Sequence, residues 1–505
     1  MRRSFLVLLL LTAIAPAAAS AAPPPIKHVF VITLENEDAA STFGPRSNAP
    51  FLARDLPAQG LFVPNYYGIG HNSLTNYIAM VSGQGPNLET QLDCIFYHDV
   101  QPATLTADGQ ATGNGCIYPK SVRTIANQLE DKGLTWHGYM EDMGLDLVRD
   151  GARRCAHPIR DWFDLTQSAT AKDQYASRHN PFVYFHSILD GSSCVANDVP
   201  LTNLPTDLAS EASTPNFSFI TPDLCNDGHD EACADGGIGG MHAANEFLKT
   251  WVPRITGSPA FKKDGLLVVT FDEADSLLSD STACCGSPVG PGSTAPGLFG
   301  PGGGRVGAVL LSPFIKPGTT TSTPYNHYGL LRSIEDLFSL PHLGFAAANG
   351  LAAFGGDVYT RPGGPPPEVP NPSPQNPTTI TTTSSTTPTT TVATTPPPIT
   401  STPVTSTSGP APTCTSPSLA GAGAALKAGT LLQGLRLDHY GTYRRVIFTA
   451  RDNAKIRIRA RGFHREIQAK RCAKYRVMFF APTASAISIT ATVGKHSEHR
   501  RRALA

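Results

Sequence analysis

Residues 26–36 read IKHVFVITLEN, an apolar run of strand length that ends in Glu35 and Asn36. Residues 266–273 read LLVVTFDE and repeat this pattern, because a second apolar run ends in Asp272 and Glu273. In an open α/β sheet the ligand site lies at the carboxyl ends of the strands. The two acidic pairs therefore predict a single site, assembled by folding from segments far apart in the chain.

Strand-like and helix-like segments alternate through the first two thirds of the sequence. Near-continuous apolar strands alternating with helices predict an α/β fold, with a mostly parallel central sheet and helices on both faces. In residues 121–133, Ser121 is the expected N-cap and Gly133 the expected residue after the C-cap. The predicted strands are residues 26–34, 135–140, 182–188, 217–221, 266–271 and 306–312, and the clearest helices are residues 121–133 and 242–255.

Composition divides the 505 residues into four parts. Residues 1–21 combine Arg2 and Arg3 with an apolar FLVLLLLTAIA stretch and a small-residue ending, which is typical of a cleaved secretory signal. Residues 22–363 form the predicted α/β catalytic domain. Residues 364–413 are rich in Pro, Thr and Ser and predict an extended linker. Residues 414–505 alternate apolar and basic residues, as in AKIRIRA, and predict a small β-sandwich-like domain.

The ten cysteines fit an oxidising compartment, in agreement with the predicted export. Eight precede the linker and two follow it, so each part can pair internally. Cys94–Cys116 and Cys225–Cys233 are reasonable local pairs, and Cys414–Cys472 is the one pair available within the C-terminal part. Connectivity is otherwise open. The sequence predicts a secreted, extracellular protein.

The formal net charge of zero hides a strong asymmetry. Residues 414–505 carry 18 Lys and Arg against 4 Asp and Glu, whereas residues 1–413 carry 22 against 36. The basic part could be a solvated sheet face, or it could attach the protein to an anionic surface such as a wall polymer or lipid headgroups. It lacks the aromatic residues, interleaved with basic ones, on which proteins stack the bases of single-stranded nucleic acid, so no specific nucleic-acid partner is expected.

A turn in residues 68–83, GIGHNSLTNYIAMVSG, supplies a candidate nucleophile. Ser73 follows His71 and Asn72 and enters an apolar helical stretch. A hydroxyl at such a position lies near the positive end of the helix dipole and near free backbone N–H groups. The alternative is that Ser73 only caps the helix and has no catalytic role.

The acidic pairs and Ser73 together suggest a metal site. A divalent ion held by Glu35, Asn36, Asp272 and Glu273 would lower the pKa of a coordinated Ser73 hydroxyl and polarise a phosphoryl oxygen. Because all these ligands are oxygens, Mg, Ca or Mn is favoured over zinc.

Three histidines are candidates for the remaining catalytic roles. His229 lies in ITPDLCNDGHD and His327 in PYNHYGLLRSIEDLF, and either could contact phosphate or protonate the leaving alkoxide. His71 is a third candidate. Asp227 and Asp230, beside His229, are interpreted as solvated loop carboxylates that could orient it.

Six ordered blocks resemble the bacterial phosphoesterase family of the alkaline phosphatase superfamily, which contains secreted acid phosphatases and non-zinc phospholipases C. The blocks are LEN, HNSLTNY, ITPDLCNDGHD, FDE, GRVGAVLLSPFIKPGT and YNHYGLLRSIEDLF, within residues 26–345. The resemblance implies an alkaline-phosphatase-like fold and a metal-dependent phosphoesterase with a covalent phosphoserine intermediate. It also implies that Glu35, Asn36, Asp272 and Glu273 are metal ligands, that Ser73 is the nucleophile, and that His229 and His327 belong to the active site.

Two departures from the family pattern favour its acid-phosphatase branch. FDEADSLLSDSTACCGSP replaces a Gly-rich block that often ends in Asp-His-Val, and Gly228 stands where Met is common. The expected substrate is therefore a small phosphomonoester. A phospholipase C or phosphodiesterase acting on a phospholipid headgroup is the alternative within the family. A non-catalytic secreted surface-binding protein is the alternative outside it.

Overall fold

The computed structural model describes residues 23–361, 425–426, 430–440, 443–460, 463–471, 474–480, 486–494 and 496–503. The chain falls into two compact units that divide between Gln375 and Asn376, and each is described by itself. The predicted signal peptide, the linker and the Cys414–Cys472 pair lie outside the described residues. The domain boundaries therefore stay predictions.

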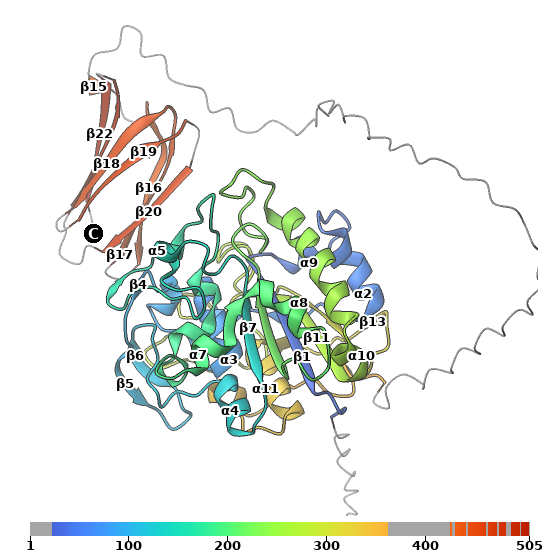
Figure 1. The fold of residues 1–505 in the computed structure, drawn as a ribbon. Helices are drawn as coiled ribbons and strands as arrows, with labels where there is room; N and C mark the ends of the chain where they lie inside the picture. Colours follow the sequence, from blue (N-terminus) through green and yellow to red (C-terminus); the bar gives the residue numbers. More distant parts are fainter. Residues whose placement is uncertain are drawn as a thin grey trace, which may run out of the picture. The chain divides into compact units, whose positions relative to one another are not determined.

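The first unit is built on an eight-stranded, mostly parallel sheet (Figure 1). At its centre, β1 pairs in parallel with both β10 and β11, whereas β12 is antiparallel to its two neighbours. The predicted fold class is thus confirmed. The strand order is β13 (Thr319–Thr320), β2 (Leu61–Val63), β12 (Ala308–Leu311), β11 (Gly265–Phe271), β1 (His28–Leu34), β10 (Phe217–Thr221), β7 (Trp136–Met140) and β9 (Asp198–Pro200).

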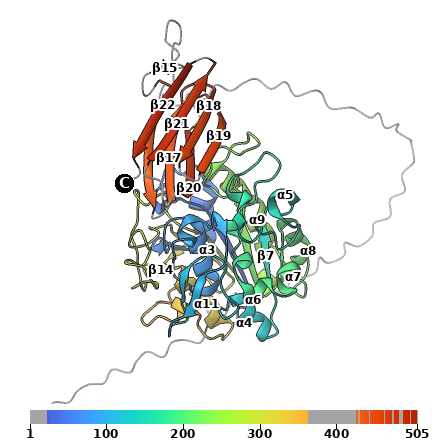
Figure 2. The same ribbon diagram turned by 90° about the vertical axis from the view of Figure 1, so that its left-hand side faces the viewer.

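Helices cover both faces of this sheet because its central strands are apolar on both sides. Every residue of β1 and β11 is buried. On one face α3 (Ser73–Ser82) packs against α11 (His327–Leu337) and α4 (Ile125–Asp131) (Figure 2). On the other face α9 (Gly240–Thr256) packs against α10 (Pro259–Asp264), which contacts β1 and β11.

Shorter elements fill the connections of the first unit. They are α1 (Ala39–Thr42), η1 (Phe51–Asp55), α2 (Leu56–Gln59), β3 (Tyr66–Tyr67), η2 (Thr90–Leu92), β4 (Phe96–Tyr97), β5 (Gln101–Leu105), β6 (Ala111–Asn114), α5 (Leu147–Asp150), β8 (Trp162–Phe163), η3 (Leu165–Gln167), η4 (Ser177–His179), α7 (Ser193–Asn197), η6 (Leu201–Asn203), α8 (Leu204–Asp207), β14 (Tyr325–Asn326) and η7 (Gly344–Ala347).

One predicted strand is wrong. Residues 182–188 form the end of η5 (Pro181–Tyr184) and the start of α6 (His186–Leu189). Asn180 caps η5 by accepting a hydrogen bond from the Phe182 backbone N–H, and Pro181 fixes its first position. A short buried apolar run cannot be assigned to strand or helix by periodicity alone.

The N-cap of α4 also differs from the prediction, since Thr124 takes the place expected for Ser121. The Thr124 side chain accepts from the Asn127 backbone N–H, and the Asn127 side chain accepts from the Thr124 backbone N–H. This reciprocal capping satisfies two free donors at the helix start. Gly133 has φ +70° just after the C-cap, as expected.

Four disulfides pair all eight cysteines that precede the linker. Cys94–Cys116 and Cys225–Cys233 are confirmed. The other two pairs are Cys155–Cys194 and the sequence neighbours Cys284–Cys285. Among the described residues no helix has the length and apolar character needed to cross a membrane.

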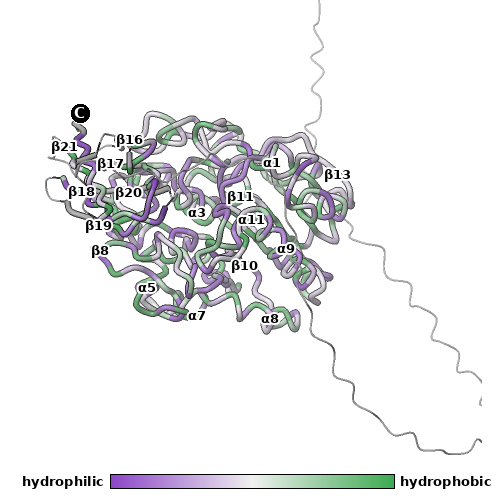
Figure 3. Tube along the Cα trace, turned by 90° about the horizontal axis from the view of Figure 1, so that it is seen from above, coloured by the Kyte–Doolittle hydropathy of each residue, from purple (hydrophilic) through white to green (hydrophobic). Residues whose placement is uncertain are grey.

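The second unit is a β-sandwich, in agreement with the prediction. Alternating hydrophobic and hydrophilic residues run along its strands (Figure 3). Val446 and Phe448 from one sheet and Ile456 and Ile489 from the other share one buried core. The first sheet has five strands in the order β15 (Ala425–Leu426), β22 (His496–Ala503), β21 (Ala486–Val493), β18 (Ala454–Ala460) and β19 (Phe463–Ala469). The second sheet has three strands in the order β16 (Leu432–Tyr440), β17 (Tyr443–Ala450) and β20 (Lys474–Phe480).

We expect Asp198→Asn to stabilise the first unit at alkaline pH. Asp198 is fully buried in β9, its Oδ2 accepts from Asn180, and its Oδ1 has no hydrogen-bond partner in the part of the chain that the structure describes. Burial raises the Asp198 pKa from 3.8 to about 8. Between these values the folded state binds the proton that the unfolded state releases, so wild-type stability falls as pH rises.

The asparagine variant lacks this titration. Its urea midpoint should therefore match that of wild type near pH 4.5 and be higher than that of wild type near pH 8. At pH 8 the free energy of unfolding of the variant should exceed that of wild type by about 1 kcal/mol or more. Equal midpoint differences at both pH values would contradict the expectation.

Candidate functional site

The two acidic pairs meet at one edge of the sheet. Leu34 and Phe271 are register partners at the ends of β1 and β11, so the residues that follow them lie side by side. The Asn36 backbone N–H donates to Asp272 Oδ1 (3.0 Å), and its side-chain nitrogen donates to Glu273 Oε1 (2.6 Å). The structure thus brings together the four residues predicted as metal ligands, although their role stays a prediction.

Ser73 joins this cluster as the first residue of α3. Its hydroxyl donates to Glu35 Oε2 over 2.7 Å, and only 5% of the residue is exposed. The turn before it is fixed by Asn76, whose side-chain oxygen accepts from the Ile69 and Gly70 backbone N–H groups (2.8 and 3.1 Å). The Asn76 side-chain nitrogen donates to Glu273 Oε2 (3.1 Å), which ties this turn to the acidic pair.

Glu35 lies at the centre of the polar network. Besides Ser73, Tyr77 donates its hydroxyl to Glu35 Oε1 (2.7 Å). The His179 ring stacks on Tyr77, with centroids 5.3 Å apart, and its Nε2 lies 3.4 Å from Glu35 Oε1. Burial and the nearby Asp227 raise the pKa of Glu35 well above its usual value.

Arg178 and His179, both in η4, are site residues that the sequence reasoning missed. Both are buried, and Arg178 Nη1 and both His179 ring nitrogens lack a hydrogen-bond partner within the described residues. Burial and the Arg178 charge hold the His179 pKa well below its usual value, so the imidazole is neutral. Arg178 and His179 precede an apolar run. The sequence pattern used to predict site residues was an apolar run followed by polar residues, so it did not identify this pair.

Asp227 corrects a further interpretation. It is fully buried instead of solvated, and its Oδ2 has no hydrogen-bond partner among the described residues. Its Oδ1 accepts from the His229 backbone N–H (2.9 Å), and the Glu35 backbone N–H donates to its carbonyl oxygen (2.8 Å). Burial raises its pKa to about 8.

His327 is placed behind the acidic pair. Its Nε2 lies 2.6 Å from the Asp272 carbonyl oxygen, so Nε2 carries the proton, and Tyr66 then donates its hydroxyl to Nδ1 (3.2 Å). Burial lowers the His327 pKa to about 4. With both ring nitrogens engaged, His327 positions the segment after β11. The predicted contact with substrate stays a prediction.

His71 and His229 flank the cluster in different environments. His71 Nε2 lies 2.8 Å from the Asp280 carbonyl oxygen, and Nδ1 lies 3.8 Å from Glu273 Oε1, an ion-pair distance. Burial alone would lower the His71 pKa, but Glu273 outweighs it and raises the pKa. The His229 side chain is 37% exposed, so its imidazole is accessible to solvent.

The donor set suits a hard divalent cation. Glu35, Asp272 and Glu273 are buried carboxylates, and burial is the first cause that raises the pKa of each. Asp272 Oδ2 is fully buried without a hydrogen-bond partner within the described residues. Carboxylate, amide and hydroxyl oxygens are the ligands that Mg, Ca and Mn prefer. A bound cation would relieve both the like-charge repulsion and the unsatisfied oxygen.

A second group of acidic and cysteine side chains does not suit an ion. Cys155, Cys194 and Asp198 bring their ligand atoms within 4.8 Å of one another. The two sulfurs are joined in a disulfide, so neither is a thiolate.

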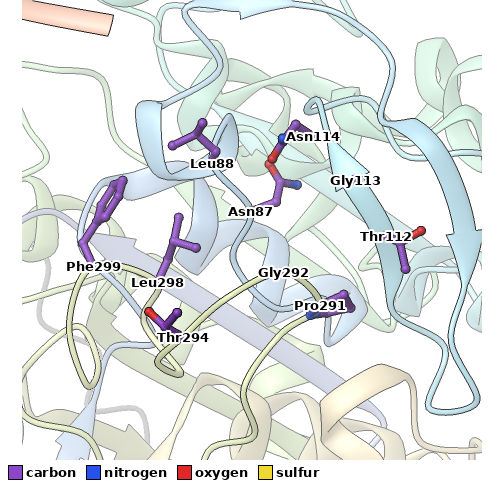
Figure 4. A pocket seen from close by; sticks show the side chains of 10 residues that line it. All are labelled: Asn87, Leu88, Thr112, Gly113, Asn114, Pro291, Gly292, Thr294, Leu298 and Phe299. Carbon is purple, nitrogen blue, oxygen red and sulfur yellow. The ribbon is translucent and has the colours of Figure 1, made fainter. Parts of the chain in front are cut away.

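A cavity of about 550 Å³ is lined by residues from three segments of the first unit (Figure 4). None of its lining residues is one of the predicted site residues. Asn87 donates its backbone N–H to Thr90, whose hydroxyl oxygen lies 3.4 Å from that of Thr75 in α3. On the other side, Gln91 donates to the Gly297 carbonyl (3.1 Å). The lining residues are Asn87, Leu88, Thr112, Gly113, Asn114, Pro291, Gly292, Thr294, Leu298 and Phe299.

A family model described as the Phosphoesterase family matches residues 46–341, more than half of the sequence. The chain belongs to this family. The matched residues include Ser73, His229, Asp272 and His327, whereas Glu35 and Asn36 precede them. The resemblance inferred from the six sequence blocks is thereby confirmed.

Curated relatives carry phosphatase names. The chain is 27% identical to an acid phosphatase of Aspergillus fumigatus over 62% of this chain and 55% of the relative. It is 25% identical to a probable acid phosphatase of Kluyveromyces lactis over 63% and 59%. It is also 25% identical to a phosphatidylinositol-3-phosphatase of Mycobacterium tuberculosis over 63% and 79%. The chain thus spans less than two thirds of the two fungal enzymes.

Among solved structures, the chain is similar to a protein in the alkaline phosphatase superfamily from Vibrio parahaemolyticus. The TM-score is 0.36 at 13% identity, over 63% of this chain and 69% of that one.

Proposed function

We propose that this chain is a secreted, metal-dependent phosphoric ester hydrolase that cleaves phosphomonoesters through a phosphoserine at Ser73. The observation that carries the proposal is the Ser73 hydroxyl at the start of α3, 2.7 Å from Glu35 and beside the end of β11. Membership of the phosphoesterase family and the acid phosphatase names of the relatives support the reaction class. The four disulfides support export.

In the proposed reaction, Ser73 Oγ attacks phosphorus in line with the leaving oxygen. Ser73 first loses its proton to water, and the Oγ–P bond then forms as the bond from phosphorus to the leaving oxygen breaks. A divalent ion held by Glu35, Asn36, Asp272 and Glu273 would supply Lewis-acid polarisation and a lower hydroxyl pKa. The start of α3 contributes the positive end of its dipole to the developing negative charge.

His229 and Arg178 complete this proposal. The exposed His229 imidazolium gives its proton to the leaving alkoxide, and the neutral imidazole then takes a proton from the water that attacks phosphoserine. That step breaks the Oγ–P bond, and Ser73 regains its proton from water. Arg178 Nη1, which has no hydrogen-bond partner among the described residues, is a donor for a phosphate oxygen.

Chelation should abolish turnover of an aryl phosphomonoester. After treatment with a chelator, we expect wild-type kcat/KM to fall at least about 100-fold, because the hydroxyl loses its electrophilic partner. Adding Mg, Mn or Ca salts one at a time should restore the rate with at least one ion. Full activity in chelator would contradict the metal-dependent mechanism.

The same assay can separate the alternatives. Faster hydrolysis of phosphatidylcholine than of the aryl monoester would indicate a phospholipase C. Hydrolysis of a phosphatidylinositol phosphate would indicate that a lipid phosphomonoester is a substrate, which agrees with the proposed reaction. Absence of turnover on every ester, with all metals, would favour a surface-binding protein.

A further inference from the structure

The outer face of the five-stranded sheet in the C-terminal unit is a regular array of cationic and hydroxyl side chains. Strands β22, β21, β18 and β19 lie side by side in this sheet (Figure 2). In β18, Lys455, Arg457 and Arg459 alternate with buried residues such as Ile456 and Ile458. The alternation sends the basic side chains to the face opposite the core.

The neighbouring strands continue the same face. In register, Arg459 of β18 is paired with Ser488 of β21, which is paired with Arg501 of β22. Arg457 is likewise paired with Thr490, and Thr490 with His499. Lys455 stands in a third row with Thr492 and Ser497. We call these nine residues the basic grid.

The spacing of the basic grid suits an extended ligand. Alternate residues of a strand lie about 6.6–6.8 Å apart and neighbouring strands about 4.8 Å apart. The grid thus covers about 13 Å by 10 Å. Its middle strand presents hydroxyl groups between two strands that carry cations. Arginine and hydroxyl donors in such rows can bind successive oxyanions along one chain.

The grid is not required to hold the sandwich together. The core of this unit consists of the opposite side chains, among them Ile456, Ile458, Ile487 and Ile489. The C-terminal part carries few carboxylates. Glu498 is buried, accepts from the Leu431 and Leu432 backbone N–H groups and lies 3.5 Å from Arg500, and Glu466 is the register partner of Arg457. Over residues 414–505 the balance is 18 basic to 4 acidic.

We propose that the basic grid binds a linear anionic polymer that carries phosphate or carboxylate groups along its chain, and thereby localises the enzyme on it. Charge complementarity supports this occupant. A membrane-inserting surface needs exposed apolar side chains, and no large hydrophobic side chain is exposed among those residues of this unit whose side chains the structure describes. The inference does not depend on the proposed catalytic reaction.

The test uses the full-length protein and long-chain inorganic polyphosphate, with polygalacturonate as the carboxylate probe. A grid variant, Arg457→Gln/Arg459→Gln/Arg501→Gln, should bind about 100-fold more weakly than wild type. A control with the same charge loss outside the grid, Arg451→Gln/Lys470→Gln/Arg471→Gln, should change affinity by about threefold or less. Replacing the three grid arginines by lysine should restore most of the binding, because charge is kept.

Several results would overturn the proposal. Equal losses in the two glutamine variants would mean that net charge alone matters. Tighter binding to phosphatidylserine–phosphatidylcholine vesicles, or to single-stranded DNA, than to either polymer would assign the face to another partner. Hydrolysis of a soluble aryl phosphate should be unchanged in the grid variant, which separates this outcome from failure of the catalytic proposal. An unchanged far-UV circular dichroism spectrum confirms that the variant is folded.

Discussion

Ser73→Ala should lower kcat for an aryl phosphomonoester by about 10⁴-fold or more. The substitution removes the hydroxyl at the start of α3 that donates to Glu35 Oε2, and alanine keeps the helix intact. Because the lost group acts on the reacting phosphorus, the effect should fall on kcat more than on KM. Rapid acid quenching should trap a phosphorylated wild-type protein, with phosphate on Ser73, and leave the variant unlabelled.

Ser82→Ala is the matched control for this change. Ser82 ends the same helix, is equally buried, and donates its hydroxyl to the Ile78 carbonyl oxygen (2.7 Å). Its loss should cost about 1 kcal/mol of stability and leave kcat within about threefold. Label on another residue, or more than a tenth of wild-type activity in Ser73→Ala, would exclude Ser73 as the nucleophile.

The sheet and its acidic edge could be predicted because each depends on local sequence. Apolar strands that alternate with helices determine a mostly parallel sheet, and the residues after β1 and β11 must then meet at one edge. Ser73 could be found because the polar turn before it contrasts with the buried helix it opens. These features need no knowledge of which distant segments pack together.

Arg178, His179 and the buried Asp227 could not be found in this way. Arg178 and His179 reach the site because η4 packs against α3, a contact between segments about 100 residues apart. In the sequence, Asp227 resembles a solvated loop carboxylate. It is buried only because the folded chain brings it beside the Glu35 backbone, whose N–H donates to the Asp227 carbonyl oxygen. Residues 182–188 were assigned to a strand because a buried apolar run carries the same pattern in either conformation.

Asp272→Asn should weaken binding of the divalent ion at least about 100-fold. The Asn36 backbone N–H donates to Asp272 Oδ1, so the asparagine should keep its oxygen there and place its NH₂ group where Oδ2 stood. Oδ2 is the buried oxygen without a hydrogen-bond partner in the described residues, and an NH₂ group cannot ligate a cation. Aryl phosphate turnover should fall in parallel and recover partly at high metal concentration.

The stability of the same variant should change in opposite directions with and without metal. In chelator, Asp272→Asn should be more stable than wild type by about 1 kcal/mol, because one of three crowded buried carboxylates is neutral. With metal at about 100 times the wild-type dissociation constant, wild type should gain about 2.7 kcal/mol and the variant much less. The order of the two thermal midpoints should therefore invert when metal is added.

Asp264→Asn supplies the control at the opposite end of β11. Asp264 is also buried, but it pairs with His28 at the other edge of the sheet, with 2.5 Å between His28 Nδ1 and Asp264 Oδ1. Its replacement should destabilise the protein to the same extent with and without metal, since the lost hydrogen bond does not touch the ligand cluster. If both variants show the same metal-induced midpoint shift as wild type, the ion does not bind at Asp272. An inversion confined to Asp272→Asn would place the ion at the edge where the two acidic pairs meet.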